Sequence, residues 1–284
     1  MTVSQLNQKR PNKRSFSFKT IPWLTLWSIG VYAILFAPVA VIVLFSFNDS
    51  QSRFNLIWHG FTLKNWLNPF ADPTLAQAFF TSLALALLAT CLCILLALPM
   101  TMALERFRIR GASALEMLLV LPLTLPEVVL GASLLLLFVQ LRLPPGPVAL
   151  VIAHTLFCLS YTAMALKARL GGHDWTLEEA AADLGAKPSR IFTQITLPRL
   201  APGLLSAGLL SLSISMDDYV VSSITAGSVV TFPLRIAGAF QRQISPQIHV
   251  LSTMVLLISL VALVLSCREP EGRTNASTVG TDGD

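Results

Sequence analysis

Six long apolar runs constrain the fold of this chain more than any other feature of its sequence. They cover residues 23–45, 78–104, 115–139, 148–168, 203–226 and 248–266. A helix of about 20 apolar residues crosses the roughly 30 Å hydrocarbon core of a bilayer, and it satisfies its own backbone hydrogen bonds there. Strands of a membrane barrel would be shorter and polar at every second residue. The pattern therefore predicts an all-α, polytopic membrane protein with six transmembrane helices.

The small share of charged residues excludes a soluble enzyme. Only 12% of the residues are charged and 54% are hydrophobic, whereas soluble domains carry about 25% charged residues. The net charge of +5 comes from Lys and Arg in short loops between the apolar runs. We therefore expect membrane lipid, and not nucleic acid, to be the partner of these charges.

Signatures of catalysis and of cofactor binding are missing from the sequence. The chain has no G-x-x-x-x-G-K-[ST] run, so we do not expect it to bind ATP through a P-loop. The four histidines are scattered without the spacing of metal ligands, and the four cysteines are predicted to pack as small apolar side chains. We predict a transport subunit with no catalytic residues, no metal and no cofactor, which must draw its energy from another subunit.

The distribution of Lys and Arg predicts the orientation in the membrane. Fifteen of the 20 lie before the first run, between the second and third, at the end of the fourth or between it and the fifth, or after the sixth, and five lie in the remaining loops. Cytoplasmic loops carry the excess of positive residues. Both termini are thus predicted in the cytoplasm, and the 46–77, 140–147 and 227–247 segments outside.

The chain divides into three parts on this view. Residues 1–22 form a basic cytoplasmic leader, residues 23–266 the membrane domain, and residues 267–284 a polar tail expected to be disordered. The first apolar run is interpreted as a retained helix, because it is too long for a signal peptide and no clear cleavage site follows it.

The longest predicted cytoplasmic loop between two runs, residues 169–202, begins with a helix signal. Thr176 and Glu179 fit a capping box, in which a threonine at the helix start pairs with a glutamate three residues later. Alanines follow, and Gly185 is predicted to end the helix. Glu179 is therefore a candidate for a stabilising role worth roughly 1 kcal/mol.

A second helix is predicted in the same loop. Pro188 suits its first turn, and Pro198 is predicted to end it. The pair forms a helix–glycine–helix elbow on the cytoplasmic surface, short of the membrane. A plain surface loop at the level of the lipid headgroups is the alternative.

This elbow carries a resemblance to a known family. Its fixed residues match the spacing E-A-A-x-x-x-G-x(9)-I-x-L-P at Glu179, Ala180, Ala181, Gly185, Ile195, Leu197 and Pro198. The loop resembles the EAA loop of permease subunits of binding-protein-dependent ABC importers. The stretches 44–48, 157–158, 177–186 and 215–218 are similar to the putrescine/spermidine branch, most of all to the second permease of putrescine importers.

The resemblance implies a fold, a role and partners. It implies the type I importer fold, also called MetI-like, and a chain that acts in the bacterial inner membrane. The EAA loop would be the coupling helix that docks on the ATPase, with Glu179, Ala180, Ala181 and Gly185 as its coupling residues. The implied partners are two copies of an ATPase, a second permease in a heterodimer and a periplasmic polyamine-binding protein.

Acidic residues inside the apolar runs are candidates for the substrate pathway. An acid at membrane depth costs a few kcal/mol, which makes a functional role the default hypothesis. Glu127 is predicted near the midplane of the third run, after two prolines, and Asp217 and Asp218 lie in the fifth. Neighbouring helix positions differ by about 100°, so only one of the two aspartates is expected to face a pathway. Tyr219 adds a ring that can stack on a cation.

A stripe of small residues on the fifth run predicts a packing face. Gly203, Ala207, Ser211 and Ser215 recur at four-residue spacing, and Asp218 continues that stripe. Asp217 belongs to a second face. A structural role for either aspartate at a subunit interface is the alternative to pathway lining.

An acidic path flanked by an aromatic ring suits a polyamine such as putrescine or spermidine. Import of another small solute by the same kind of permease is the first alternative, although the acidic pair counts against an anion. A stand-alone secondary transporter or channel is the second. It would need no partner ATPase, and the sequence shows none of the internal inverted repeats that mark many secondary transporters.

Overall fold

The computed structural model describes residues 22–50, 54–107, 110–241 and 244–267 of the 284-residue chain. Regular structure in these residues is helical, apart from two isolated bridge pairs between loop residues. The predicted leader and tail fall almost wholly outside the described residues. The long helices are α1 (Pro22–Phe45), α3 (Pro73–Arg106), α6 (Pro147–Leu170), α9 (Leu197–Asp217) and α12 (Pro246–Cys267).

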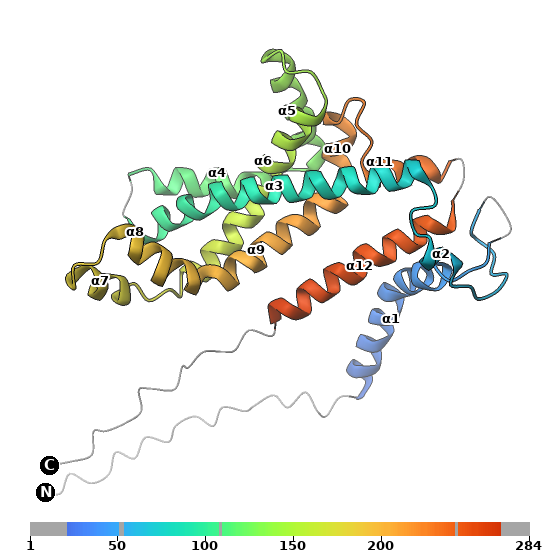
Figure 1. Ribbon diagram of the computed structural model, residues 1–284, viewed down its shortest axis with the longest axis horizontal. Helices are drawn as coiled ribbons and strands as arrows, with labels where there is room; N and C mark the ends of the chain where they lie inside the picture. The colour runs from blue at the N-terminus through green and yellow to red at the C-terminus, as the bar shows by residue number, and fades with distance from the viewer. Residues whose placement is uncertain (1–21, 51–53, 108–109, 242–243, 268–284) are drawn as a thin grey trace, which may run out of the picture.

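Three long helices, α3, α6 and α9, form the core of the bundle, and each packs against the other two (Figure 1). Small side chains allow the close approach: α3 buries Ala86, Ala89 and Ala97 completely, and α6 buries Ala149 and Ala153. Such contacts replace the hydrophobic driving force that lipid does not supply. The predicted small-residue stripe of α9, from Gly203 through Ser215, is buried here as expected.

Local signals in the sequence fix where two of these helices begin. The Asp72 carboxylate accepts hydrogen bonds from the backbone N–H groups of Thr74 (2.9 Å) and Leu75 (3.2 Å), which caps α3 behind Pro73 at its first turn. Pro147 likewise opens α6. At the other end of α6, Lys167 and Arg169 lie in the last turn, where positive charge complements the helix dipole.

The third apolar run is not one helix, which corrects the prediction of a single continuous span. It folds as α4 (Ala112–Thr124) and α5 (Glu127–Gln140), which are bent by 114°. The break falls at Leu125, whose backbone is extended before Pro126, because a residue that precedes proline is pushed out of the helical region. Glu127 therefore begins a new helix instead of lying in the middle of one.

The fifth run is broken as well. Helix α9 ends at Asp217, Asp218 is extended, and α10 (Val220–Thr225) follows. The two short helices that follow the breaks, α5 and α10, pack on each other, and Gly131 of α5 lies directly against Ile224 of α10. They project together from one side of the bundle (Figure 1).

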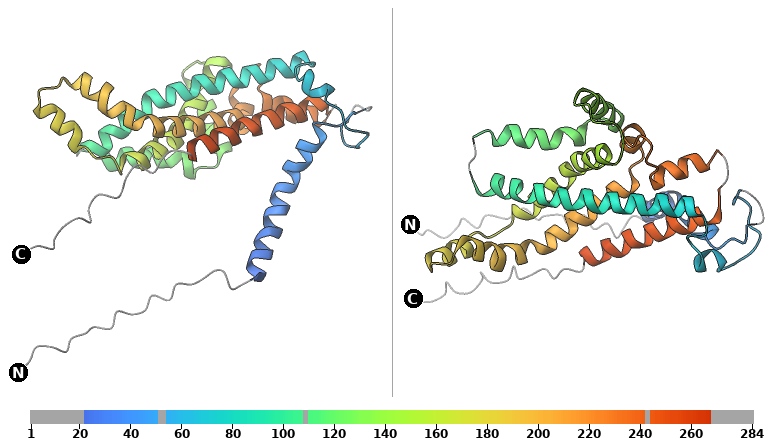
Figure 2. Two further views of the ribbon diagram at one scale, coloured as in Figure 1. Left: turned by 60° about the horizontal axis from the view of Figure 1, so that its bottom comes forward. Right: turned by 45° about the horizontal axis from the view of Figure 1, so that its top comes forward.

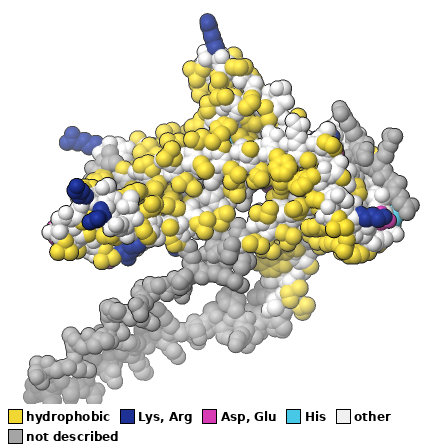
Figure 3. Space-filling model, in the orientation of Figure 1, with side chains coloured by type: hydrophobic (Ala, Val, Ile, Leu, Met, Phe, Trp, Pro, Cys, Tyr) yellow, Lys and Arg dark blue, Asp and Glu magenta, His cyan; other side chains and the backbone are white. Residues whose placement is uncertain are grey.

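The peripheral helices complete the bundle. Helix α12 packs on α9, and α11 (Phe232–Ala239) packs on α3 and α9. Helix α1 contacts α12 but diverges from the bundle along most of its length (Figure 2), with no buried residue in its most apolar stretch. On the face shown in Figure 3, apolar side chains extend along the bundle, and the Lys and Arg side chains lie mainly toward its ends.

The number of spans is only partly tested among the described residues. Four helices are long and apolar enough to cross a membrane, and the broken pair α4–α5 would make a fifth. Helix α12 covers 22 residues, Pro246–Cys267, and its side chains are described only as far as Val261. Six transmembrane helices therefore remain a prediction.

Candidate functional site

The predicted elbow lies at one end of the bundle, beyond the end of α6 (Figure 1). It begins with α7 (Thr176–Asp183), but the predicted capping box does not form. Thr176 is already the first helical residue, and both its N–H (3.1 Å) and its hydroxyl (2.7 Å) donate to the Asp174 carboxylate. These hydrogen bonds hold the pKa of Asp174 below its ordinary value. A carboxylate two residues before the helix is the stronger acceptor and takes the role assigned to the threonine.

The predicted helix stop at Gly185 is confirmed. Gly185 has a φ of +80°, its N–H donates to the Ala182 carbonyl (2.9 Å), and the Ala186 N–H donates to the Ala181 carbonyl (3.0 Å). This is the Schellman arrangement, which favours glycine because other residues are strained at positive φ. Pro188 then opens α8 (Pro188–Ile191), also as predicted.

The predicted stop at Pro198 is wrong. Helix α8 continues through a π turn, η2 (Phe192–Thr196), directly into α9, so residues Pro188–Asp217 form one continuous helical run. A wide turn with i→i+5 hydrogen bonds makes room for the proline ring and for its missing N–H. The second arm of the elbow is therefore the start of the membrane helix itself.

The residues matched to the EAA spacing lie on the open side of α7. Glu179, Ala180 and Gly185 are exposed, and Ala181 is half-buried. Small exposed side chains on a short helix leave room for a partner surface to approach closely. Nothing in the described residues covers this surface.

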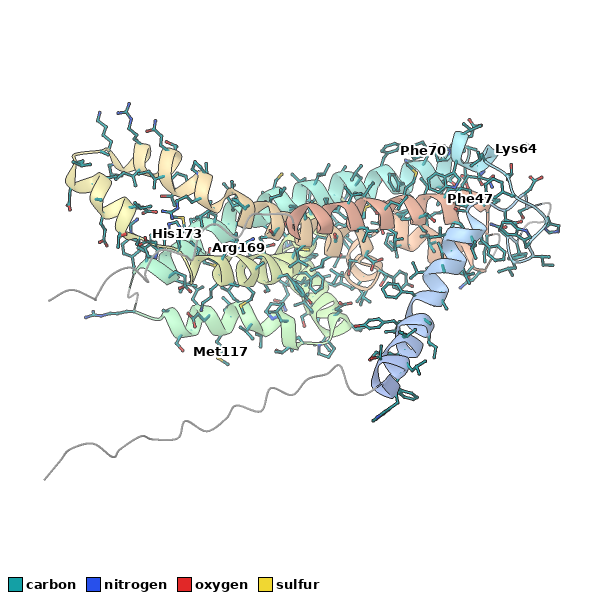
Figure 4. All side chains as sticks on the ribbon, turned by 90° about the horizontal axis from the view of Figure 1, so that it is seen from below. Phe47, Lys64, Phe70, Met117, Arg169 and His173 are labelled. Atoms are coloured by element: carbon teal, nitrogen blue, oxygen red, sulfur yellow. The ribbon has the colours of Figure 1, made fainter. Side chains whose placement is uncertain are left out.

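One functional candidate in the elbow was missed by sequence reasoning. Glu178, the neighbour of Glu179, is only 1% exposed. Its carboxylate pairs with Arg106 (2.5 Å) and accepts a hydrogen bond from the Thr196 hydroxyl (2.6 Å). It also lies 3.3 Å from His173 Nε2; Figure 4 shows His173 beside Arg169, at the end away from Lys64 and Phe70. No local pattern distinguished Glu178, because its partners are up to 72 residues away in sequence.

The two aspartates at the α9–α10 break have different surroundings. Asp218 is 7% exposed, and its carboxylate accepts hydrogen bonds from the N–H groups of Val221 (3.2 Å) and Ser222 (2.8 Å). It also lies 3.3 Å from Nε2 of His154 on α6. Asp218 thus caps the start of α10 and ties it to α6.

His154 is a second residue whose position the sequence did not reveal. It lies buried in α6, with its ring nitrogens 2.8 Å from the Ser215 hydroxyl and 2.9 Å from the Ser222 hydroxyl. The serines belong to α9 and α10, so one imidazole bridges both sides of the break. A lone histidine in an apolar run gave no indication of these partners.

Asp217 is exposed and faces a cavity of about 380 Å³. The cavity lies between α9, α11 and α12, and its lining includes Tyr219, Phe232, Ile236 and Ser252. Among the described residues, neither Asp218 nor Glu127 lines it. This cavity joins a carboxylate and a phenol ring in otherwise mostly apolar surroundings.

Glu127 lies apart from this cavity. It is exposed at the start of α5, close enough to Tyr161 of α6 for an electrostatic interaction. Of the four predicted pathway residues, Asp217 and Tyr219 line this cavity, whereas Asp218 and Glu127 do not. Among the described residues, no group of His, Cys, Asp and Glu could hold a metal ion.

Comparison with known proteins gives a consistent family assignment. The model of the family described as "Binding-protein-dependent transport system inner membrane component" matches residues 94–267. The chain is 37% identical over 237 residues to the spermidine/putrescine transport system permease protein PotC of Haemophilus influenzae, covering 83% of this chain and 91% of the relative. It is 31% identical over 264 residues to the putrescine transport system permease protein PotI of Escherichia coli, covering 89% and 93%.

Solved structures share the fold at low sequence identity. A bacterial ABC transporter involved in the import of the acidic polysaccharide alginate matches with a TM-score of 0.60 at 14% identity, covering 86% of this chain and 92% of that chain. The MetNI methionine ABC transporter, in an inward-facing conformation, matches with a TM-score of 0.57 at 16% identity, covering 70% and 96%. The predicted MetI-like helical fold is thereby confirmed.

Proposed function

Because this chain belongs to the family of inner membrane components of binding-protein-dependent transport systems, we propose that it is the permease subunit of an ABC importer for polyamines. The observation that carries the substrate class is the 31–37% identity, over most of the chain, to permeases named for putrescine and for spermidine/putrescine. The expected cargo is putrescine, and spermidine is a second candidate of the same chemistry.

The cavity beside Asp217 supports a cationic substrate. Primary amines of this kind are protonated at neutral pH, as lysine is. The exposed Asp217 carboxylate can pair with one ammonium group, and the Tyr219 ring can receive a cation on its face. The apolar lining from α11 and α12 suits the methylene chain between the charges. In this proposal Asp217 and Tyr219 line the pathway, whereas Asp218 holds the shape of the break beside them.

Glu127 has a place in the same proposal. It begins α5 at the break of the third apolar run, on a surface that is open in this chain. We assign it to the pathway on a separate wall from Asp217, so that a diamine meets the two acids in sequence.

The elbow is proposed as the contact with the ATPase. Glu179, Ala180, Ala181 and Gly185 form its open surface, and the rigid turn at Gly185 fixes α7 relative to the start of α9. Two ATPase copies, a second permease and a periplasmic polyamine-binding protein complete the proposed importer. ATP binding closes the ATPases, moves the elbows and opens the helices to the outside, and hydrolysis resets them.

The proposed topology places the elbow and both termini in the cytoplasm. Residues 1–22 are the cytoplasmic leader, 23–266 the permease domain and 267–284 the cytoplasmic tail. The opposite end, with the predicted outer segment 46–77, then faces the binding protein. The excess of Lys and Arg on the elbow side supports this orientation.

The test is uptake of labelled putrescine in cells that lack polyamine transport. The chain is expressed with and without its ATPase, second permease and binding protein. Uptake that needs all partners is the expected result. Uptake by the chain alone would indicate a secondary transporter. No putrescine uptake with the full set of partners would instead favour import of another small solute by the same kind of permease.

A further inference from the structure

We propose that Glu178 is the residue through which the ATPase-facing helix α7 moves the membrane helices. It is a positioning residue, because it acts through its neighbours and contacts neither the substrate nor ATP in this scheme. The inference rests on the proposed function of α7 as the ATPase contact. It assigns separate tasks to two neighbouring glutamates.

The carboxylate of Glu178 connects α7 to each helix of the core. Arg106 is the last residue of α3 and pairs with Glu178 at 2.5 Å. Thr196, the last residue of the π turn, donates to it at 2.6 Å, directly before α9 begins. His173, three residues beyond the end of α6, lies 3.3 Å away. One side chain thus gathers the elbow-side ends of α3, α6 and α9.

Burial makes this connection stiff. Glu178 is 1% exposed, and the guanidinium of Arg106 is held from a second side by the Trp175 ring, 5.3 Å from its centroid. Charge-assisted hydrogen bonds are short and directional. A buried carboxylate that loses such a partner is left uncompensated, at a large cost. Displacement of α7 therefore carries the three helix ends with it more readily than it breaks the cluster.

The neighbouring Glu179 points to the opposite role. Adjacent positions on a helix differ by about 100° in direction, and Glu179 is exposed while Glu178 is buried. The helix thus presents one carboxylate to an incoming partner and the next to its own membrane helices. A partner that pushes on the exposed side of α7, at Glu179, therefore acts within one helical turn of the buried Glu178 and its contacts to the other helices.

Another ion pair at the same end provides a matched control. Lys167 of α6 pairs with Glu116 of α4 at 2.7 Å, and both side chains are partly exposed. Among the described residues, this pair makes no hydrogen bond or ion pair with α7, so Glu116→Gln removes a similar charge interaction without touching the proposed connection. It reports the general effect of losing a carboxylate at this end of the bundle.

The experiment uses the full importer in liposomes: this chain, the second permease, the ATPase and the binding protein with putrescine. The variants are Glu178→Gln, Arg106→Gln, the double variant and Glu116→Gln. Readouts are the amount of ATPase that co-purifies, ATP hydrolysis with and without loaded binding protein, and putrescine uptake per ATP hydrolysed. The last ratio separates loss of transmission from a merely structural defect.

We expect Glu178→Gln to keep the ATPase bound and hydrolysing while uptake per ATP falls about tenfold, the change that one lost charge-assisted hydrogen bond produces. Arg106→Gln should lose at least as much, because it leaves the buried Glu178 carboxylate without its charged partner. The double variant should be no worse than Arg106→Gln, because both break one pair. Glu116→Gln should resemble the wild type. If Glu178→Gln fails to assemble, Thr196→Val, which removes one hydroxyl, should still lower uptake per ATP.

Normal uptake per ATP in Glu178→Gln, or an equal loss in Glu116→Gln, would overturn the role of Glu178 and leave the proposed importer function standing. Normal uptake per ATP in Thr196→Val, where Glu178→Gln does not assemble, would do the same. Failure of the proposed function has a different signature. The wild-type complex would then show neither hydrolysis stimulated by the binding protein nor putrescine uptake, and the role of Glu178 would fall with it.

Discussion

Substitution of the two adjacent aspartates by alanine should have opposite consequences for stability and transport. Asp218→Ala removes the acceptor of two α10 N–H groups, at 2.8 and 3.2 Å, and the partner of His154 at 3.3 Å. A buried hydrogen-bond donor left without its acceptor costs about 1–3 kcal/mol. Asp217→Ala removes an exposed carboxylate, and such changes are usually within about 0.5 kcal/mol.

The magnitude translates into a measurable shift of the unfolding equilibrium. At about 1.4 kcal/mol for each factor of ten, Asp218→Ala should raise the unfolding constant by roughly one to two powers of ten, and Asp217→Ala by less than about threefold. Equilibrium unfolding of the purified chain in detergent micelles measures this. Asp218→Asn keeps one oxygen that can accept a backbone hydrogen bond, so its loss should fall between the two.

Transport gives the complementary readout. Asp217→Ala should lower putrescine uptake although the folded chain and its assembly with the ATPase are retained, because the exposed carboxylate faces the cavity. Equal destabilisation by Asp217→Ala and Asp218→Ala would refute the assignment of Asp218 to the helix break. Normal uptake by a stable Asp217→Ala chain would show that the cavity is not the substrate path.

Three further substitutions test other parts of the structure. Gly185→Pro should abolish uptake while membrane insertion persists, since proline cannot adopt a φ of +80°; normal uptake would contradict the coupling role of the elbow. Gly203→Leu should destabilise the bundle by about 1–3 kcal/mol in the same unfolding assay, because even a Cβ added at this position would lie 3.0 Å from the Arg169 side chain. Unchanged stability would show that the Arg169 side chain moves aside without cost. Asp72→Ala should cost about 1 kcal/mol through loss of the α3 cap. Burial raises the pKa of Asp72, but hydrogen bonds from Thr74 and Leu75 leave this pKa below its ordinary value of 3.8. The ionised cap therefore contributes its full stabilisation above pH 3.8. The difference in stability between wild type and Asp72→Ala should vanish as pH falls through the lowered pKa.

The predictable part of the fold is the part governed by local chemistry. Apolar length located the long helices, the glycine at 185 and the proline at 188 marked the elbow, and four-residue spacing of small side chains identified the buried face of α9. Each of these signals acts within a few residues of itself. The family resemblance likewise rested on a compact spacing of residues in one loop, and the family match confirms it.

The errors arose where a local rule met a competing backbone geometry. Pro198 was predicted to end a helix, but the π turn before it absorbs the ring. The apolar run 115–139 predicts Leu125 inside a helix, but the following proline forces its backbone to be extended. Thr176 was given the capping role that Asp174 performs, because the exact first helical residue cannot be read to within one or two positions.

The residues that were missed depend on contacts between distant segments. Glu178 meets Arg106 across 72 positions, and His154 meets Ser215 across 61. No periodicity or spacing in the sequence predicts hydrogen-bond partners this far apart. The sequence therefore showed only that ionisable side chains lie near apolar runs. Which of two neighbouring carboxylates is buried was decided by the packing of α3, α6 and α9.

The π turn between α8 and α9 also sets a rotational phase. Each residue of a helix advances its direction by about 100°, and the wide turn at Phe192–Thr196 places one more residue in this stretch than a regular helix would use. The sequence positions that share a face are therefore offset by one residue between α8 and α9, while the wide turn keeps the two helices aligned in space. Removal of one residue from the π turn would regularise the helix and leave the elbow at nearly its present bearing, whereas removal of one residue from the regular part of α9 would turn the elbow by about 100°.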